Sequence, residues 1–302
     1  TLIRTLRLSD VTRQFLSTRL KSNDLLSTYL QIPRKRAGPP NLAPWTLPLF
    51  RNRRSLGSFH GSQLHAIMLL KARQRTSVWE ISHAFSTPLG YTDIDELLIH
   101  GVRLATKAGA VRIFLRAPTT SPADGPAKRA GFKEVYKEDL MVGSVLSTGS
   151  KPLELHKLQA SDLYTLFQLH SAVVDPRIRF AIAMTFEQWL ASRETPVGYA
   201  QEYVWKEGFT AVAWLCINWQ RTSIVVDAIV HPEHVRSTDS LLEAAYRIIG
   251  YQKKVYWVVR DHENIISNAL NLKGWRVDSS YTVLMKSVTT FAPQASMLPI
   301  QV

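Results

Sequence analysis

Residues 222–230, TSIVVDAIV, begin the most informative part of the sequence. The run is apolar almost throughout, which is typical of a strand covered on both faces, and residues 255–260, VYWVVR, share this character. Between them, residues 239–249, DSLLEAAYRII, carry apolar side chains at helical spacing, so one stripe of a helix can pack on a sheet. A short helix ending at residues 273–275, KGW, and a strand at residues 281–286 complete the unit.

The same unit occurs a second time in the first half of the chain. A strand at 76–85, a helix at 93–107, a strand at 111–116, a KRAGF turn at 128–132 and a last strand at 134–142 follow in the same order. Both copies begin the first strand with Thr-Ser, end the second strand with Arg, and place Lys shortly before a Gly-aromatic pair. Because chance would not repeat all of these features in one order, we predict a tandem repeat of one domain.

The 302 residues suit two domains, each long enough to bury most of its apolar surface. We expect an α/β (α+β) fold with a mixed central sheet flanked by helices in each domain. The first domain is predicted to cover residues 1–147 and the second residues 153–288. Residues 148–152, TGSKP, are small, polar and marked by Gly and Pro, as in a linker, and residues 289–302 form a tail.

Each domain is predicted to begin with elements that precede the repeated unit. In the first domain these are a strand within residues 1–10, a helix over residues 11–29 and a pair of strands in residues 55–73. In the second domain they are a strand at 153–158, helices at 161–173 and 185–193, and a strand pair at about 202–219.

The composition, 45% hydrophobic and 20% charged, is that of an ordinary globular protein. The only cysteine, Cys216, excludes an intramolecular disulfide, and its apolar neighbours favour a buried structural thiol over a reactive one. No apolar run approaches the roughly 20 residues that span a bilayer, and the first residues do not resemble a signal peptide. A cytoplasmic protein without a transmembrane segment is therefore expected, and no residue pattern predicts a metal site.

The net charge of +13 is concentrated in the first half of the chain. Residues 1–150 hold 22 Lys and Arg against 10 Asp and Glu, net +12, whereas residues 151–302 hold 15 against 14, net +1. A basic surface of this kind attracts polyanions such as nucleic acid, an acidic protein face, anionic lipid or a phosphorylated cofactor.

Part of this charge lies in residues 32–54, a Pro-rich segment that interrupts every periodic pattern and is predicted to be an extended arm. Two interpretations stay open: a solvated loop, or an arm that contacts nucleic acid or an acidic protein, with Trp45 and Phe50 available for stacking. The basic residues concerned are Arg34, Lys35, Arg36, Arg51, Arg53 and Arg54.

The order of elements resembles the GNAT superfamily of acetyl-CoA-dependent N-acetyltransferases. The residues that carry the resemblance are VHPEH at 230–234, Asn264, and the closing turns KGW at 273–275 and KRAGF at 128–132. The resemblance extends over nearly the whole chain, once in each of the two repeats. The resemblance implies acetyl-CoA as cofactor and transfer of an acyl group to an amine substrate.

In that family, a glycine-rich turn between the fourth strand and the next helix lets backbone N–H groups approach the cofactor pyrophosphate. The corresponding turns here contain one glycine in the first domain and none in the second, and an aspartate, Asp93 or Asp239, stands near each helix start. The cofactor contacts that the resemblance implies are Pro88, Leu89, Gly90, Tyr91, Val235, Arg236, Ser237 and Thr238.

The family's usual general acid is a tyrosine four residues before the Gly-aromatic pair, but Ala127 and Leu270 stand there, or Asn271 if the helix is one residue shorter. Its general base is often a carboxylate on the fourth strand, which corresponds to Glu80 and Asp227. Apolar neighbours would raise the pKa of such a carboxylate and suit it to deprotonate an ammonium group. A structural acid is the alternative for both residues.

Three functions stay open. The first is an N-acyltransferase with one active site, in which Arg236 or the basic first domain replaces the missing cradle. The second is a catalytically silent GNAT-fold pair that binds a partner or builds an assembly. The third is a nucleic-acid- or ribosome-associated binder that uses the basic half. The sequence specifies neither the acyl acceptor nor the oligomeric state.

Overall fold

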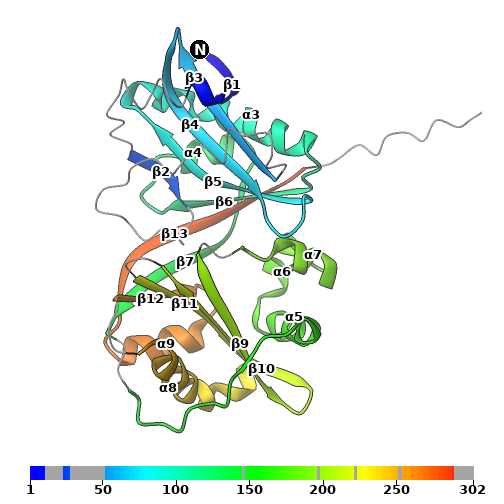
Figure 1. The fold of residues 1–302 in the computed structure, drawn as a ribbon, viewed down its shortest axis with the longest axis vertical. Helices are drawn as coiled ribbons and strands as arrows, with labels where there is room; N and C mark the ends of the chain where they lie inside the picture. The colour runs from blue at the N-terminus through cyan, green and yellow to red at the C-terminus, as the bar shows by residue number, and fades with distance from the viewer. Residues whose placement is uncertain are drawn as a thin grey trace, which may run out of the picture.

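The computed structural model describes residues 1–10, 23–27, 52–144, 147–195, 198–220, 223–250 and 254–288. Figure 1 shows the first half of the chain above the second, with β13 and β7 running between them. The elements of the first half are β1 (Leu2–Thr5), β2 (Asn23–Ser27), β3 (Arg53–His60), β4 (Gln63–Ala72), β5 (Val78–Ser86), the 3₁₀ helix η1 (Pro88–Asp93), α3 (Ile94–Lys107), β6 (Arg112–Pro118), α4 (Asp124–Arg129) and β7 (Lys133–Gly143).

The second half repeats the order of the first from its strand pair at residues 199–219 onward. Its elements are β8 (His156–Lys157), η2 (Ala160–Asp162), α5 (Leu163–Val173), α6 (Pro176–Ile182), α7 (Phe186–Ser192), β9 (Tyr199–Glu207), β10 (Thr210–Trp219), β11 (Ser223–Val230), η3 (Pro232–Ser237), α8 (Thr238–Ile249), β12 (Lys254–Arg260), α9 (Asn264–Leu272) and β13 (Arg276–Ser287).

The repeated unit predicted from the sequence is confirmed in both halves, as is a mixed sheet flanked by helices. The prediction of a helix over residues 11–29 is wrong at residues 23–27, which form β2, and its other residues lie outside the described part. Arg53 and Arg54 belong to β3 rather than to an extended arm. The domain boundaries at residues 147 and 153 stay a prediction.

The repeated Gly-aromatic pair ends a helix in the same way in both halves. Gly131 and Gly274 have φ values of +88° and +77°, a region that favours glycine. After each of them an aromatic residue donates its backbone N–H back to the helix, from Phe132 to Ala127 O (3.0 Å) and from Trp275 to Leu270 O (3.2 Å). This is a Schellman cap, in which the aromatic side chain then packs into the core. The motif therefore serves the fold.

All described strands belong to one mixed sheet, in the order β1-β3-β4-β5-β6-β13-β7-β12-β11-β10-β9-β8, with β2 beside β5. The closing strand of each repeat pairs with the other repeat. β13 is antiparallel to β6, with Leu284 opposite Leu115, and β7 is antiparallel to β12, with Met141 opposite Trp257. Because β13 and β7 also pair with each other, the two halves are joined by exchanged strands at their centre.

The helices divide between the two faces of the sheet. α3 and α4 pack on one face of the first half, and α8 and α9 occupy the corresponding place in the second. The stripe predicted on α8 is confirmed, since Leu241, Leu242 and Ala245 are buried. α5 and α7 cover the opposite face of the second half, where they pack on Val204 of β9 and Ile229 of β11. Beside α5–α7, this face carries a large group of buried charges around a hollow.

Candidate functional site

A pocket of about 160 Å³ lies where the two halves meet. Helices α5 to α7 form one wall, and strands β9 to β12 form the other, with Arg73, Phe114 and Tyr136 added from the first half. Its apolar lining comprises Phe114, Tyr136, Leu166, Ile182, Trp189, Trp214, Val225 and Ile229. Its polar lining comprises Arg73, His170, Ser192, Arg193, Glu194, Glu202, Cys216, Asn218, Asp227 and Arg260.

Strand alternation brings the sheet residues of the pocket together. Every second residue of β10 from Trp214 to Asn218, and of β11 from Val225 to Ile229, points to this face. The residues between them pack with α8 and α9 on the other face. In the antiparallel register Cys216 lies opposite Asp227, so a carboxylate stands in the middle of the pocket floor.

Asp227 is held by an arginine from the neighbouring strand. Arg260, the last residue of β12, donates from Nη2 to Asp227 Oδ2 (2.7 Å) and from Nη1 to Asp227 Oδ1 (3.0 Å). Arg260 Nη1 also lies 2.8 Å from Glu263 Oε1. Burial tends to lower the pKa of Arg260, but Asp227 and Glu263 outweigh it and raise that pKa well above the usual value. The apolar surroundings predicted for Asp227 are therefore replaced by a fixed cation.

Glu263 shares this arginine with Asp227. Burial raises the pKa of Glu263 to about 7, because Arg260 opposes the effect only in part and the Asp227 charge adds to it. The site thus contains a carboxyl group that titrates near neutrality next to the pocket floor.

A second set of ion pairs extends from the pocket into the first half. Glu194, which follows α7, accepts from Arg116 Nη2 (2.8 Å) and from Arg73 Nη2 (3.2 Å). Arg73 is fixed in turn by Glu80 (2.9 Å) and by the backbone oxygen of Ser192 (2.7 Å). Burial disfavours the charge of Glu194, but Arg116 and Arg73 outweigh burial and lower its pKa to about 2.

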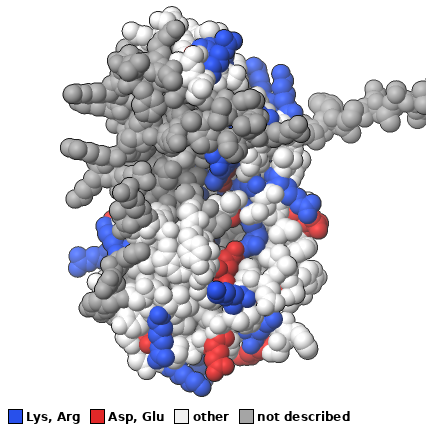
Figure 2. Space-filling model, in the orientation of Figure 1, with Lys and Arg blue, Asp and Glu red and all other residues white. Residues whose placement is uncertain are grey.

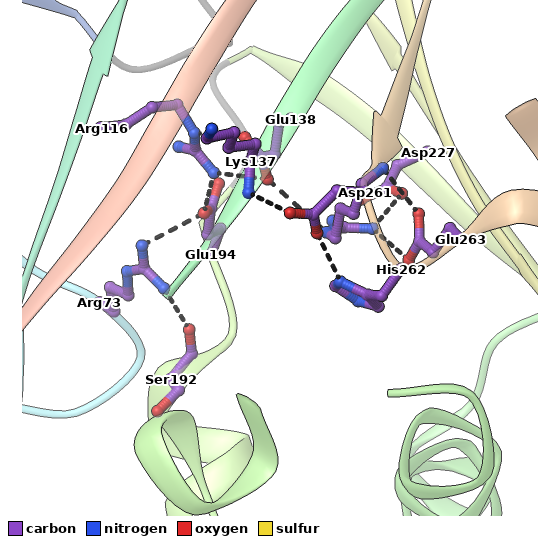
Figure 3. A network of polar contacts seen from close by, with 11 residues as sticks. Arg73, Arg116, Lys137, Glu138, Ser192, Glu194, Asp227, Asp261, His262 and Glu263 are labelled. Atoms are coloured by element: carbon purple, nitrogen blue, oxygen red, sulfur yellow. Dashed lines mark hydrogen bonds and ion pairs between the residues drawn. The ribbon is translucent and has the colours of Figure 1, made fainter. Parts of the chain in front are cut away.

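The two sets meet at Glu138 of β7. Arg116 Nε donates to Glu138 Oε2 at 2.6 Å, and Arg260 Nε lies 3.6 Å from Glu138 Oε1. These are the two arginines predicted to end the second strand of each repeat, so both copies of the repeated Arg share one partner, Glu138. Figure 3 shows the acidic and basic side chains alternating from Arg73 to Glu263, and Figure 2 shows red and blue side chains adjacent near the middle of one face.

The two carboxylates predicted as bases occupy different surroundings. Asp227 lines the pocket. Glu80 is buried outside the pocket lining, between Lys71 Nζ (2.9 Å) and Arg73 Nε (2.9 Å). The ion pairs connect Glu80 to Asp227 through a chain of alternating charges, namely Arg73, Glu194, Arg116, Glu138 and Arg260. Which of them acts as a base stays a prediction.

Several uncharged polar groups in the pocket were not predicted from the sequence. Burial, together with Arg260, lowers the pKa of His170 to about 3, so its imidazole is neutral at pH 7. Burial also raises the pKa values of the Cys216 thiol and the Tyr136 phenol. The Asn218 amide is buried without a hydrogen-bond partner among the described residues. These side chains come from α5, β10 and β7, which no local motif connects.

The parallel strand pairs diverge next to the network. The pairing of β5 with β6 ends at Ile81 although β5 continues to Ser86, and the pairing of β11 with β12 ends at Asp227 although β11 continues to Val230. Both divergences therefore begin before the strand ends, ahead of Phe85 in β5 and ahead of Val230 in β11.

The gap between the diverging strands differs between the halves. β4 pairs with one edge of β5 from Trp79 to Ser86, so β2, which pairs with residues 83–86, takes the other edge, on the side of β6. The chain's own strand therefore fills the gap of the first half. Beside residues 228–230 of β11, no strand of the described chain takes the corresponding place.

The two turns predicted to hold the cofactor are short 3₁₀ helices. In η1, the N–H of Gly90 donates to Thr87, and a Cβ on Gly90 would lie 2.3 Å from the backbone oxygen of His65. Gly90 thus permits close packing on β4, and the Tyr91 hydroxyl donates to Pro122 O (2.9 Å). Pro88 and Leu89 belong to the same helix.

In η3, Val235 and Arg236 are exposed, whereas Thr238 is buried and donates to Val235 O at 2.7 Å. Ser237 is the residue before α8 and makes no side-chain cap. Asp239 is paired with Lys273 (2.9 Å). The role of these residues in cofactor binding stays a prediction.

The basic arm can be followed only at its end. Arg34, Lys35, Arg36 and Arg51 lie outside the described residues. Arg54 stacks 5.7 Å from the Trp79 ring, and Arg53 lies opposite Lys71 of β4. The described helices include none that is long and apolar enough to cross a membrane, and no group of three or more potential ligands for a metal ion occurs in the same residues.

No protein-family model matches the chain, and no curated protein matches it. Solved structures do. A tandem GNAT protein from the clavulanic acid biosynthesis pathway, solved without AcCoA, is 11% identical with a TM-score of 0.54 over 96% of this chain and 99% of that chain. A conserved protein of unknown function from Enterococcus faecalis, described as a probable N-acyltransferase, is 10% identical with a TM-score of 0.50 over 95% of this chain and 72% of that chain.

A functionally unknown conserved protein from Staphylococcus epidermidis is 9% identical with a TM-score of 0.53 over 77% of this chain and 95% of that chain. Sequence identities this low support a common fold. They carry no information about activity, which has to be argued from the site. Together with the repeated unit and the diverging strands, the structural matches show that this chain has the GNAT acetyltransferase fold in two tandem copies.

Proposed function

We propose that the protein is an acyl-CoA-dependent N-acyltransferase whose single active site lies in the second half. The observation that carries this proposal is the pocket with Asp227 in its floor, at the point where β11 and β12 diverge. A thioester entering along the gap and an amine held in the pocket would meet beside this carboxylate.

The second half suits the extended arm of an acyl-CoA better than the first. An extended chain with amide groups pairs with an open strand edge, and residues 228–230 continue β11 beyond its pairing with β12. In the first half, β2 already occupies the matching edge. The exposed Arg236 and the N-terminus of α8 would face the phosphates, although the turn lacks the glycines of the family pattern.

The bound acyl-CoA supplies an acyl group activated as a thioester, and the residues of this chain prepare the amine. Transfer to a desolvated pocket lowers the pKa of an ammonium group, so the amine is neutral when its lone pair attacks. As the carbon–nitrogen bond forms, the carbon–sulfur bond of the thioester would break and CoA would leave as its thiolate, while Asp227 would accept the proton that the amine loses. Arg260 fixes the orientation of that carboxylate through two hydrogen bonds.

The variant Asp227→Asn tests this assignment. A general base contributes about a hundredfold or more, so turnover with acetyl-CoA and a small amine should fall by about that factor. The thermal shift caused by acetyl-CoA should remain, because Asp227 binds the acceptor side. Glu80→Gln separates the two candidate bases, since Glu80 lies outside the pocket and its variant should retain transfer. Equal losses in both variants would refute the choice of Asp227.

A catalytically silent binding or assembly protein is the second candidate. The observation that favours it is the form of the two turns: the Gly90 amide is used within η1, and η3 contains no glycine. A ligand at 100 times its dissociation constant stabilises a protein by about 2.7 kcal/mol. Absence of any thermal shift with millimolar acetyl-CoA, together with absence of transfer, would favour this candidate over the enzyme.

A further inference from the structure

The pocket is small. A cavity of about 150 Å³ in another protein accommodates benzene, so the volume of about 160 Å³ found here suits a ligand of similar size. Peptides and protein side chains with attached backbone exceed this volume. The acceptor must therefore be a small molecule, or only one end of a larger one.

Every arginine in the pocket wall already has a carboxylate partner. Arg73 pairs with Glu80 and Glu194, Arg193 pairs with Glu202, and Arg260 pairs with Asp227 and Glu263. A ligand carboxylate or phosphate would thus meet no spare cation. Burying an unpaired charge is costly, so such ligands are disfavoured.

The remaining wall is apolar or neutral. Phe114, Trp189 and Trp214 provide aromatic surface from both halves of the chain. Because the pKa of His170 is lowered to about 3, the imidazole adds no charge at pH 7. The Asn218 amide of the wall, which is uncharged, is buried without a hydrogen-bond partner among the described residues.

We propose that this pocket selects, as acyl acceptor, a small primary amine whose other atoms carry no charge, of about the size of benzylamine. That the bound amine is an acyl acceptor rests on the proposed function. The selection of such an amine over one with a further charge is a property of binding alone. Amino acids with a free carboxylate and phosphorylated amines are excluded by the paired arginines.

Binding can be measured without any acyl donor. Calorimetric titration should detect benzylamine and valinamide, whereas valine, which has the same number of non-hydrogen atoms as valinamide, should bind at least about tenfold more weakly. The comparison isolates the carboxylate because size and branching are conserved. Equal affinities for valine and valinamide, or binding by none of the three, would overturn the proposal.

Breaking one ion pair of the pocket wall should remove the selection against valine. Glu202→Gln removes the charge that neutralises Arg193 and retains an acceptor for Trp214 Nε1, which donates to Glu202 at 2.9 Å. This variant should gain at least about tenfold in affinity for valine and little for valinamide. The matched control is Glu187→Gln, which breaks the exposed pair with Arg75 outside the pocket and should change neither affinity. A Glu202→Gln variant that folds and still rejects valine would contradict the paired-arginine explanation.

Donor-dependent assays then separate the two proposals. Selective amine binding without transfer from acetyl-CoA would leave the inference intact and refute the proposed function. Transfer to valine as efficient as transfer to valinamide would support the enzyme and refute the inference.

Discussion

At the residue scale, the buried charges are arranged as shared pairs. Arg260 serves both Asp227 and Glu263, and Glu194 serves both Arg73 and Arg116. Such pairs contribute little net stability when compared with apolar packing, but the loss of one member leaves a buried charge uncompensated. The network therefore fixes the relative position of the two halves and makes single substitutions costly.

Glu194→Gln should destabilise the protein by about 3 kcal/mol at pH 7, since it removes the anion between two buried arginines. The pKa of Glu194 is about 2 in the folded protein, below its ordinary value of 4.5. Its stabilisation is therefore complete above pH 4.5 and is lost as the pH falls toward 2. Urea denaturation of the two proteins at pH 7 and at pH 3 should show the difference shrinking at the lower pH.

The exposed Glu187→Gln serves as control and should change the free energy of unfolding by less than about 0.5 kcal/mol. A difference between Glu194→Gln and the unchanged protein that stays constant from pH 7 to pH 3 would show that the ionised carboxylate is not the source of the effect.

At the element scale, the apolar runs, the amphipathic helices and the Gly-aromatic caps were predictable because each depends on residues close in sequence. The position of β2 was not, since a strand of residues 23–27 depends on a partner at residues 83–86. The partners of Asp227 and Glu80 were hidden for the same reason: Arg260 lies at the end of β12, and Arg73 directly follows β4. Of the predicted site, the sequence supplied the position of Asp227, and the fold supplied its surroundings.

The two strand gaps should respond differently to the cofactor. In hydrogen exchange, acetyl-CoA should slow exchange in residues 228–230 of β11 and leave residues 83–86 of β5 unchanged, because β2 already covers the latter. Leu26→Pro removes a backbone donor from β2 and should speed exchange in residues 83–86. Protection of residues 83–86 by acetyl-CoA in the unchanged protein would place the cofactor in the first half and would contradict the proposed site in the second half.

At the scale of the whole molecule, the tandem repeat was readable from the sequence, but the exchange of closing strands was not. Local patterns identify β7 and β13 as strands and say nothing about which edge each one joins. In the structure β7 lies between β12 and β13, and β13 lies between β6 and β7. Each half therefore completes the sheet of the other, and the predicted domain limits do not delimit two self-contained sheets.

This exchange predicts how the chain behaves when its connection is cut. A protease site inserted between Gly149 and Ser150, in the predicted linker, should be cleaved without separating the fragments. The fragments remain associated because β7 and β13 pair with each other and with strands of the opposite repeat. Gel filtration after cleavage should show one species of unchanged size, whereas fragment 1–149 expressed alone should lack a cooperative unfolding transition, since the edge of β6 loses β13. Two separate, folded fragments after cleavage would refute the strand exchange and would show that the molecule is a pair of independent domains.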